Sequence, residues 1–134
     1  MPSGSCACGK IQISYTAEPA NKVVCHCRDC QRSSGSAFSI NNIVASEDFK
    51  VSGNTKVWEH TADSGKPVRN YFCDNCGTTL WTENGILEGK KIVKAGVLDK
   101  EELENAKPKV ELYASGRVGW VPAVENADQK PQMY

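Results

Sequence analysis

The amino-acid sequence predicts a small, mainly β domain built from short antiparallel strands. Three observations support this fold class. Apolar and polar residues alternate over several short runs, turn-forming residues separate these runs at close intervals, and only two stretches have the composition of a helix. The length of 134 residues suits one domain.

The expected strands follow one another along the chain with a turn signal after most of them. In the first, Ile11, Ile13 and Tyr15 alternate with polar residues, as in a strand with one buried face. The later strands are marked by Phe38, Ile40 and Val44, by Val57 and Trp58, and by residues 68–72, 79–82, 92–95 and 110–113. The turn signals lie at residues 53–54, 62–65 and 84–85 and at Gly89 and Gly116.

Helix is expected in two places only. One is a turn directly after Cys27, and the other covers residues 100–105, which Pro108 would prevent from continuing. Residues 125–134 are polar and contain Pro131, so we expect a loose C-terminal tail. The prediction is therefore a single domain over residues 1–124 and a tail over residues 125–134.

Composition excludes some functions and favours others. Sixteen basic and sixteen acidic residues give no net charge, which argues against a nucleic-acid partner. No apolar run reaches the roughly 18 residues that cross a bilayer, and the N-terminus lacks the basic and apolar regions of a secretory signal. We therefore expect a cytoplasmic protein that does not bind membranes. Seven cysteines, an odd number, in a reducing compartment are typical of metal ligands or reactive thiols rather than disulfides.

Two cysteine pairs far apart in the sequence predict a closed metal site. Cys6 and Cys8 precede Gly9, and Cys73 and Cys76 precede Gly77, where a tight turn often needs a positive φ. Four thiolates fill the tetrahedron of a zinc ion, and such a site contributes directly to folding. The alternatives are that these cysteines are only buried, that the pairs are shared differently between metals, or that the metal is iron. We call Cys6, Cys8, Cys73 and Cys76 the four-cysteine group.

The other cysteines predict an open metal site. Cys25, Cys27 and Cys30, the three-cysteine group, would leave the fourth position of zinc to water or a substrate thiol, as in catalytic zinc sites. His26 could close this site, but an extended chain from Cys25 to Cys27 would direct it to the opposite face. His60 or an acidic residue is the remaining alternative for a fourth ligand.

At these motifs the sequence resembles the family of glutathione-dependent formaldehyde-activating enzymes and centromere protein V, which has the Mss4-like fold. The matching segments are residues 4–9, 25–38 and 71–78, followed by a closing strand pair over residues 108–120. The resemblance implies a β-tent of antiparallel sheets around a structural zinc. It also implies that the four-cysteine group holds this structural zinc and the three-cysteine group holds a catalytic zinc, giving two zinc ions per chain.

The resemblance further implies the activity. We expect a zinc-dependent carbon–sulfur lyase that acts on adducts of glutathione, or a similar thiol, with a small aldehyde or other electrophile. Glutathione or its adduct is the expected partner, and Arg28, Arg32 and Lys66 are candidates to bind its carboxylates.

The remaining expectations concern the core and the alternative function. Trp58 and Trp120 are expected in the core together with Trp81. The alternative is a non-catalytic Mss4-like interaction module, against which the three-cysteine group argues.

Overall fold

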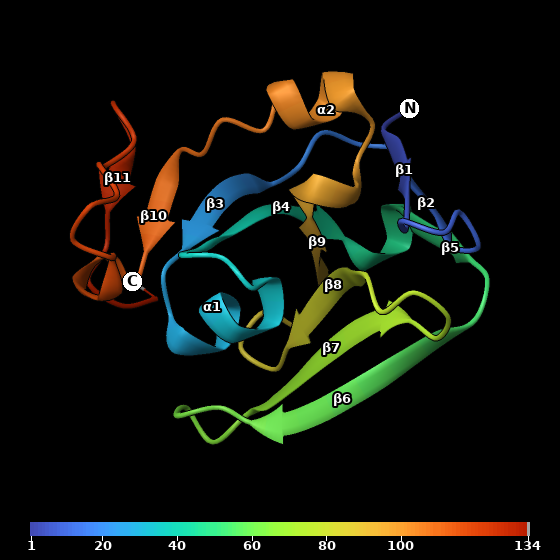
Figure 1. The fold of residues 1–134 in the computed structure, drawn as a ribbon, viewed down its shortest axis with the longest axis horizontal. Coiled ribbons are helices and arrows are strands. Elements are labelled where there is room, and N and C mark those ends of the chain that lie inside the picture. The colour runs from blue at the N-terminus through green and yellow to red at the C-terminus, as the bar shows by residue number, and fades with distance from the viewer. Residues whose placement is uncertain (134) are drawn as a thin grey trace.

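The computed structural model describes residues 1–133, which form a small sheet and a large, strongly curved sheet (Figure 1). The small sheet has the strand order β1-β2-β5 and consists of β1 (Ser3–Ser5), β2 (Gln12–Tyr15) and β5 (Phe49–Ser52). The large sheet has the order β11-β10-β3-β4-β9-β8-β7-β6. Its strands are β3 (Asn21–Cys25), β4 (Ser39–Ala45), β6 (Thr55–Thr61), β7 (Pro67–Cys73), β8 (Thr79–Asn84), β9 (Lys90–Lys94), β10 (Val110–Leu112) and β11 (Asp128–Gln129). The mainly β prediction is confirmed.

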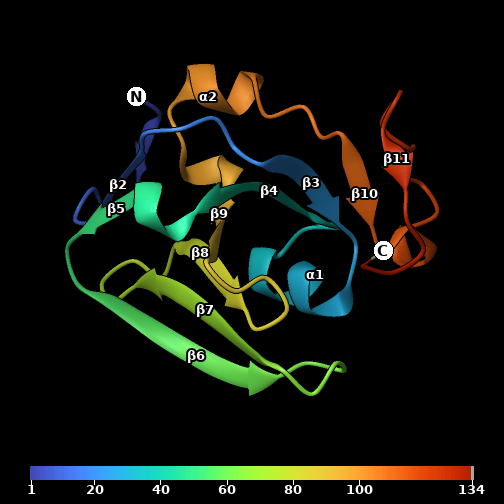
Figure 2. The ribbon, with the colours of Figure 1, turned by 180° about the vertical axis from the view of Figure 1, so that it is seen from behind.

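The strand directions are antiparallel except at one end of the large sheet. In the sheet order β3-β4-β9-β8-β7-β6, every pair of neighbouring strands is antiparallel. In contrast, β10 runs parallel to both of its neighbours, β3 and β11. The expectation of only antiparallel pairing is wrong there, because the chain crosses from β9 through a helix before it reaches the free edge of β3. Figure 2 shows β10 and β11 beside β3, at the opposite end of the sheet from β6.

Both expected helices are present. α1 (Arg28–Ser34) begins at Cys27, whose side chain accepts a hydrogen bond from the N–H of Cys30, and ends at Gly35 in the left-handed conformation. α2 (Lys100–Glu104) follows β9. Three 3₁₀ turns complete the described helices, at Ser46–Asp48, Ala95–Val97 and Ala114–Gly116. Among residues 1–133 the structure contains no helix long and apolar enough to cross a membrane.

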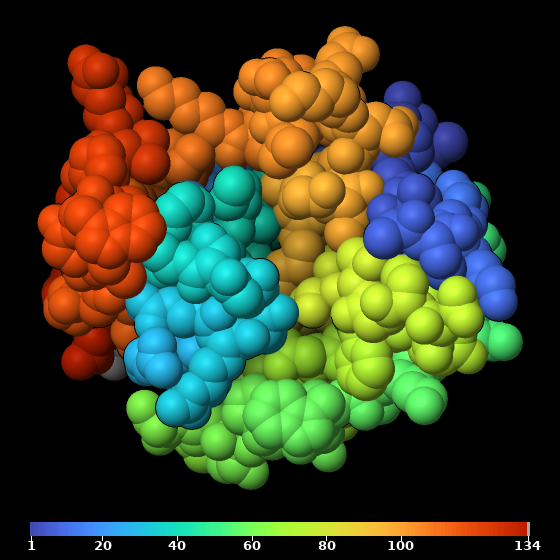
Figure 3. Space-filling model, viewed as in Figure 1, coloured from blue at the N-terminus to red at the C-terminus, as the bar shows by residue number. Residues whose placement is uncertain are grey.

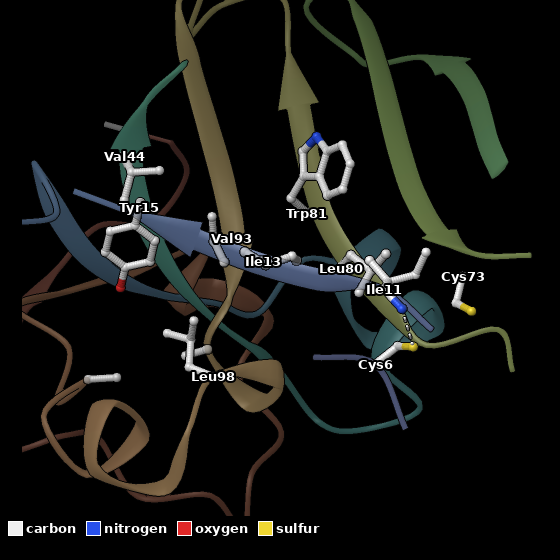
Figure 4. Packing of buried hydrophobic residues seen from close by; sticks show 12 residues of the cluster. Cys6, Ile11, Ile13, Tyr15, Val44, Cys73, Leu80, Trp81, Val93 and Leu98 are labelled. Atoms are coloured by element: carbon white, nitrogen blue, oxygen red, sulfur yellow. Dashed lines mark hydrogen bonds between the residues drawn. The ribbon is translucent and has the colours of Figure 1, made fainter. Parts of the chain in front are cut away.

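The hydrophobic core lies between the small sheet and one face of the large sheet (Figure 4). Ile11, Ile13 and Tyr15 pack against apolar residues that include Leu80 and Val93, all of them fully buried. This burial supplies the main drive for folding.

The three tryptophans have different environments. Trp81 belongs to the core, where its ring stacks on Tyr71 with a centroid separation of 4.4 Å. The expectation of burial is wrong for Trp58 and Trp120, which are 56% and 80% exposed. Trp58 lies on the edge strand β6 and stacks on His60, while Trp120 lies in the loop that precedes β11.

In place of the loose tail that the sequence predicted, residues 128–129 of the C-terminal segment form the strand β11. β11 pairs with β10, and the backbone N–H groups of Asp128 and Lys130 donate to the carbonyls of Lys109 and Glu111. The segment pairs with β10 because the backbone groups at that edge of the sheet would otherwise be unpaired. The polar composition instead reflects exposure, since both residues of β11 are exposed.

Candidate metal centres

The four-cysteine group joins two turns that are distant in the sequence. Cys6 and Cys8 lie in the turn after β1, whereas Cys73 ends β7 and Cys76 lies in the turn before β8. The four sulfur atoms lie within 4.8 Å of one another, with 3.5 Å between Cys6 and Cys8 and 3.8 Å between Cys8 and Cys73. Sulfur atoms about 2.3 Å from a tetrahedral zinc lie roughly 3.8 Å apart, so this donor set fits the ion.

Backbone N–H groups surround these sulfur atoms. The N–H of Ile11 donates to the Cys6 sulfur at 3.2 Å, and the N–H groups of Asn75 and Cys76 point at the Cys73 sulfur at 3.4 Å each. Figure 4 shows the Ile11 bond at the edge of the hydrophobic core, to which Cys6 and Cys73 belong. Such donors stabilise the thiolate form that a metal requires.

The two turns adopt the backbone conformation that the sequence predicted. Gly9 and Gly77 have φ angles of +81° and +76°. Thr78 links the turns, because its hydroxyl accepts from the N–H of Ala7 and lies 3.1 Å from the Cys76 sulfur. Hydrogen bonds from Thr78 lower the pKa of the exposed Cys76 thiol to about 5, so this ligand is a thiolate at neutral pH.

The three-cysteine group lies where β3 meets α1. Cys25 is the last residue of β3, Cys27 caps α1, and Cys30 lies in the first turn of that helix. Their sulfur atoms lie within 4.8 Å of one another, which again fits a soft metal ion. Cys25 is buried, and Cys27 and Cys30 are partly exposed.

The thiols of the three-cysteine group differ in pKa. Hydrogen bonds with Cys27 and Cys30, together with burial, raise the pKa of Cys25. Hydrogen bonds from Cys25 and Cys27 lower the pKa of Cys30, and the positive charge of Lys94 lowers it further. A cation between the sulfur atoms would favour the thiolate form of all three cysteines.

His26 faces away from this group of sulfur atoms. Its Nε2 lies 2.8 Å from Oε1 of Glu111 on β10, and both side chains are almost completely buried. The other Glu111 oxygen accepts from Gln129, Arg117 and the N–H of Val124. This cluster ties the cysteine segment to β10 and the C-terminal segment. Sequence analysis considered His26 as a metal ligand but could not pair it with Glu111, because 85 residues separate them.

His60 also does not join the three-cysteine group. Its Nε2 lies 3.3 Å from a carboxylate oxygen of Asp29, at the start of α1. The structure therefore leaves three sulfur ligands in this group among the described residues.

A hollow of about 640 Å³ lies beside α1. Arg28, Gln31 and Arg32 line it from the helix, and Phe38 and Trp120 line it from the following loop and the C-terminal segment. In Figure 3 the orange-red C-terminal segment lies directly against the cyan α1. Two of the three proposed carboxylate anchors therefore lie together, whereas Lys66 lies in the turn between β6 and β7.

The family comparison agrees with the motif order. The family model described as glutathione-dependent formaldehyde-activating enzyme matches residues 1–116. The chain belongs to this family. Two relatives that carry the family's name come from Emericella nidulans, 29% identical over 57% of this chain, and from Aspergillus flavus, 28% identical over 75% of it. The alignments cover 38% and 56% of those relatives, so the chain spans only part of their length.

Two further similarities broaden the comparison. An uncharacterized lyase of Schizosaccharomyces pombe is 31% identical over 58% of this chain and 54% of its own. The crystal structure of a Rhodobacter sphaeroides protein matches with a TM-score of 0.60 and 19% identity, over 73% of this chain and 88% of that one. At this identity the second similarity concerns the fold alone.

Proposed function

We propose that this protein is a zinc-dependent carbon–sulfur lyase that forms or cleaves adducts of glutathione, or a similar thiol, with a small aldehyde. The observation that carries the proposal is the convergence of three sulfur atoms, two of them on partly exposed residues. Membership of a family named for glutathione-dependent formaldehyde activation supports the substrate class. The chemistry needs reduced thiols and glutathione, which the cytoplasm supplies.

The two cysteine groups would hold one zinc ion each. The four-cysteine group would hold a structural ion, because four thiolates occupy every position of the tetrahedron. The three-cysteine group would hold the second ion, which supplies an open position for a thiol and lowers the pKa of that thiol. Three thiolate ligands favour a soft sulfur ligand over a hard oxygen ligand at that position.

The reaction balances without an oxidant or a further reactant. In the forward direction the thiol sulfur forms a bond to the aldehyde carbon, the carbonyl π electrons move to oxygen, and that oxygen gains the proton that the thiol loses. The reverse reaction breaks the carbon–sulfur bond. The contribution of this chain is to hold the glutathione part of the adduct, whose carboxylates Arg28 and Arg32 can bind in the hollow beside α1.

Exchange spectroscopy on a panel of glutathione–aldehyde adducts tests this function. Thiols add to formaldehyde rapidly without a catalyst, so slower adducts belong in the panel. The wild type should accelerate exchange of at least one adduct above the uncatalysed rate, and Cys27→Ser should not. If the wild type accelerates none and glutathione does not perturb a metal probe bound to the three-cysteine group, the function is that of an interaction module instead.

A further inference from the structure

Lys94 supplies a positive charge on the sheet face that carries the three-cysteine group. It is the last residue of β9 and is only partly exposed. Its Nζ donates a hydrogen bond of 2.7 Å to Oδ1 of Asn41 on β4. Asn41 is 2% exposed, and the hydrogen bond between the two side chains is partly buried.

The strand register places this contact next to the sulfur ligands. Asn41 is opposite Lys94, and Ser39, two residues earlier on β4, is opposite Cys25. Directly opposed residues and residues two apart share one face of a sheet, so all four side chains lie on the same face.

Hydrogen bonds connect the ammonium group to the residue opposite Cys25. Nδ2 of Asn41 donates to the hydroxyl of Ser39 at 3.0 Å, and Ser39 is the residue opposite Cys25 in the strand register. Because Asn41 accepts from Lys94 through Oδ1 and donates to Ser39 through Nδ2, both ends of its amide are fixed. The network therefore restrains the ammonium group on the sheet face that carries Cys25.

The charges in this region need balancing. Three thiolates around a divalent cation carry a net charge of −1, and a fourth thiolate would make it −2. Negative charge in a partly buried site is costly unless a cation lies nearby. Burial lowers the pKa of Lys94, while the negative charges of Cys30, Cys25 and Cys27 oppose this change, so the ammonium and the thiolates stabilise each other.

We propose that Lys94 is a positioning residue whose ammonium group, held by Asn41, makes the three-cysteine group select an anionic thiolate as its fourth ligand over a neutral one. The inference rests on the proposed function, since it explains why a glutathione thiolate would bind there. Under this proposal Lys94 sets the preference for anionic over neutral ligands, an effect that a purely structural residue would not have.

The test is a comparison of two ligands on protein loaded with Co²⁺, whose absorption reports the fourth ligand. Glutathione and 2-mercaptoethanol are the anionic probes and imidazole is the neutral probe, all titrated at one fixed pH. Lys94→Met should weaken both thiols about tenfold or more and change imidazole binding less than about twofold. Lys94→Arg should keep most of the thiol preference. Lys90→Met, at the opposite end of β9 in the turn with Leu87, is the matched control and should bind like wild type.

Asn41→Asp provides a second variant that keeps the lysine. A carboxylate in direct contact with Nζ should cancel its charge and weaken thiol binding as Lys94→Met does. The inference would be overturned if the ratio of thiol affinity to imidazole affinity were equal in wild type and both variants. It would also be overturned if the variants lost affinity for all ligands to the same extent. If the wild type binds 2-mercaptoethanol but not glutathione, the proposed substrate is wrong, and the 2-mercaptoethanol-to-imidazole ratio still decides the role of Lys94.

Discussion

The two cysteine groups use the same ligand atom in opposite structural settings. The four-cysteine group connects turns whose cysteines lie 65 residues apart, and two of its members belong to the hydrophobic core. The three-cysteine group comes from one segment of six residues at the junction of β3 and α1. A metal in the first group would hold distant parts of the chain together, while a metal in the second would close only a local loop.

Their surroundings differ in the same way. Backbone N–H groups of Ile11, Asn75 and Cys76 donate to the first group, and these donors are fixed by the turns themselves. The second group has Ser39 and Lys94 beside it, which are side chains from two other strands. Backbone donors suit a site that only needs stability, whereas side-chain charges can adjust which ligand binds. The comparison shows that cysteine groups of the same ligand type have different surroundings in one chain.

The largest expected effect is the loss of a ligand from the four-cysteine group. Cys73→Ser should unfold the protein or leave it without a cooperative transition, because a structural zinc contributes about as much as the ~5–15 kcal/mol by which a domain is stable. Thermal unfolding followed by circular dichroism, together with metal analysis, measures this. A folded Cys73→Ser protein with an unchanged melting temperature would remove the distinction between the two groups.

The next effect should appear in activity and not in folding. Cys27→Ser removes one of three ligands from a local loop, so we expect a folded protein that retains about one zinc ion and loses adduct exchange. The serine hydroxyl can still accept a hydrogen bond from the N–H of Cys30 and preserve the helix cap. Destabilisation as large as that of Cys73→Ser would show that the second group is also structural.

Sequence reasoning located both groups because metal-ligand spacing is local. It also located most strands whose apolar residues alternate, such as β2. It missed β3, whose residues Val23, Val24 and Cys25 are all buried and therefore do not alternate. It missed the parallel pairing of β10 because that contact joins distant segments.

The surroundings of the three-cysteine group could not be predicted from the sequence, because they too consist of contacts between distant segments. Lys94 and Asn41 are 53 residues apart, and only the strand register brings them together. The available signal was the occurrence of three polar residues, Ser39, Asn41 and Asn42, in a strand that also carries Ile40, Ile43 and Val44. Buried polar residues of this kind usually have a specific partner.

A smaller effect is expected where the cysteine segment is attached to β10. Burial alone would raise the pKa of Glu111, but hydrogen bonds from Gln129 and His26 and the nearby charge of Arg117 lower it to about 2. The stabilisation from this carboxylate is therefore fully present above its ordinary pKa of 4.5 and is lost as the pH falls toward 2. Glu111→Gln should lower the unfolding free energy by about 2–3 kcal/mol at neutral pH.

Urea unfolding of wild type and Glu111→Gln at pH values above about 5 measures this difference, which should stay constant because the carboxylate is ionised in both folded and unfolded chains there.

The rate at which each cysteine group loses zinc provides a second measurement on the same variant. The variant should lose zinc from the three-cysteine group sooner, because His26 lies between two of its ligands, and should retain the four-cysteine zinc. Equal loss from both groups would mean that Glu111 stabilises the whole domain and not the loop.

The smallest expected effect concerns the outer face of α1. Cys27 and Cys30 lie on one side of this helix, whereas Arg28 and Arg32, one turn apart, line the hollow on another. If glutathione reaches from this hollow to the sulfur ligands, Arg32→Ala should raise the KM for the adduct roughly three- to tenfold and leave kcat nearly unchanged, because an exposed carboxylate contact contributes equally to substrate and transition state. Lys66→Ala is the matched control, since that lysine lies in the turn between β6 and β7, and its KM should equal that of wild type. A larger effect from Lys66→Ala than from Arg32→Ala would place the substrate across the β6–β7 turn.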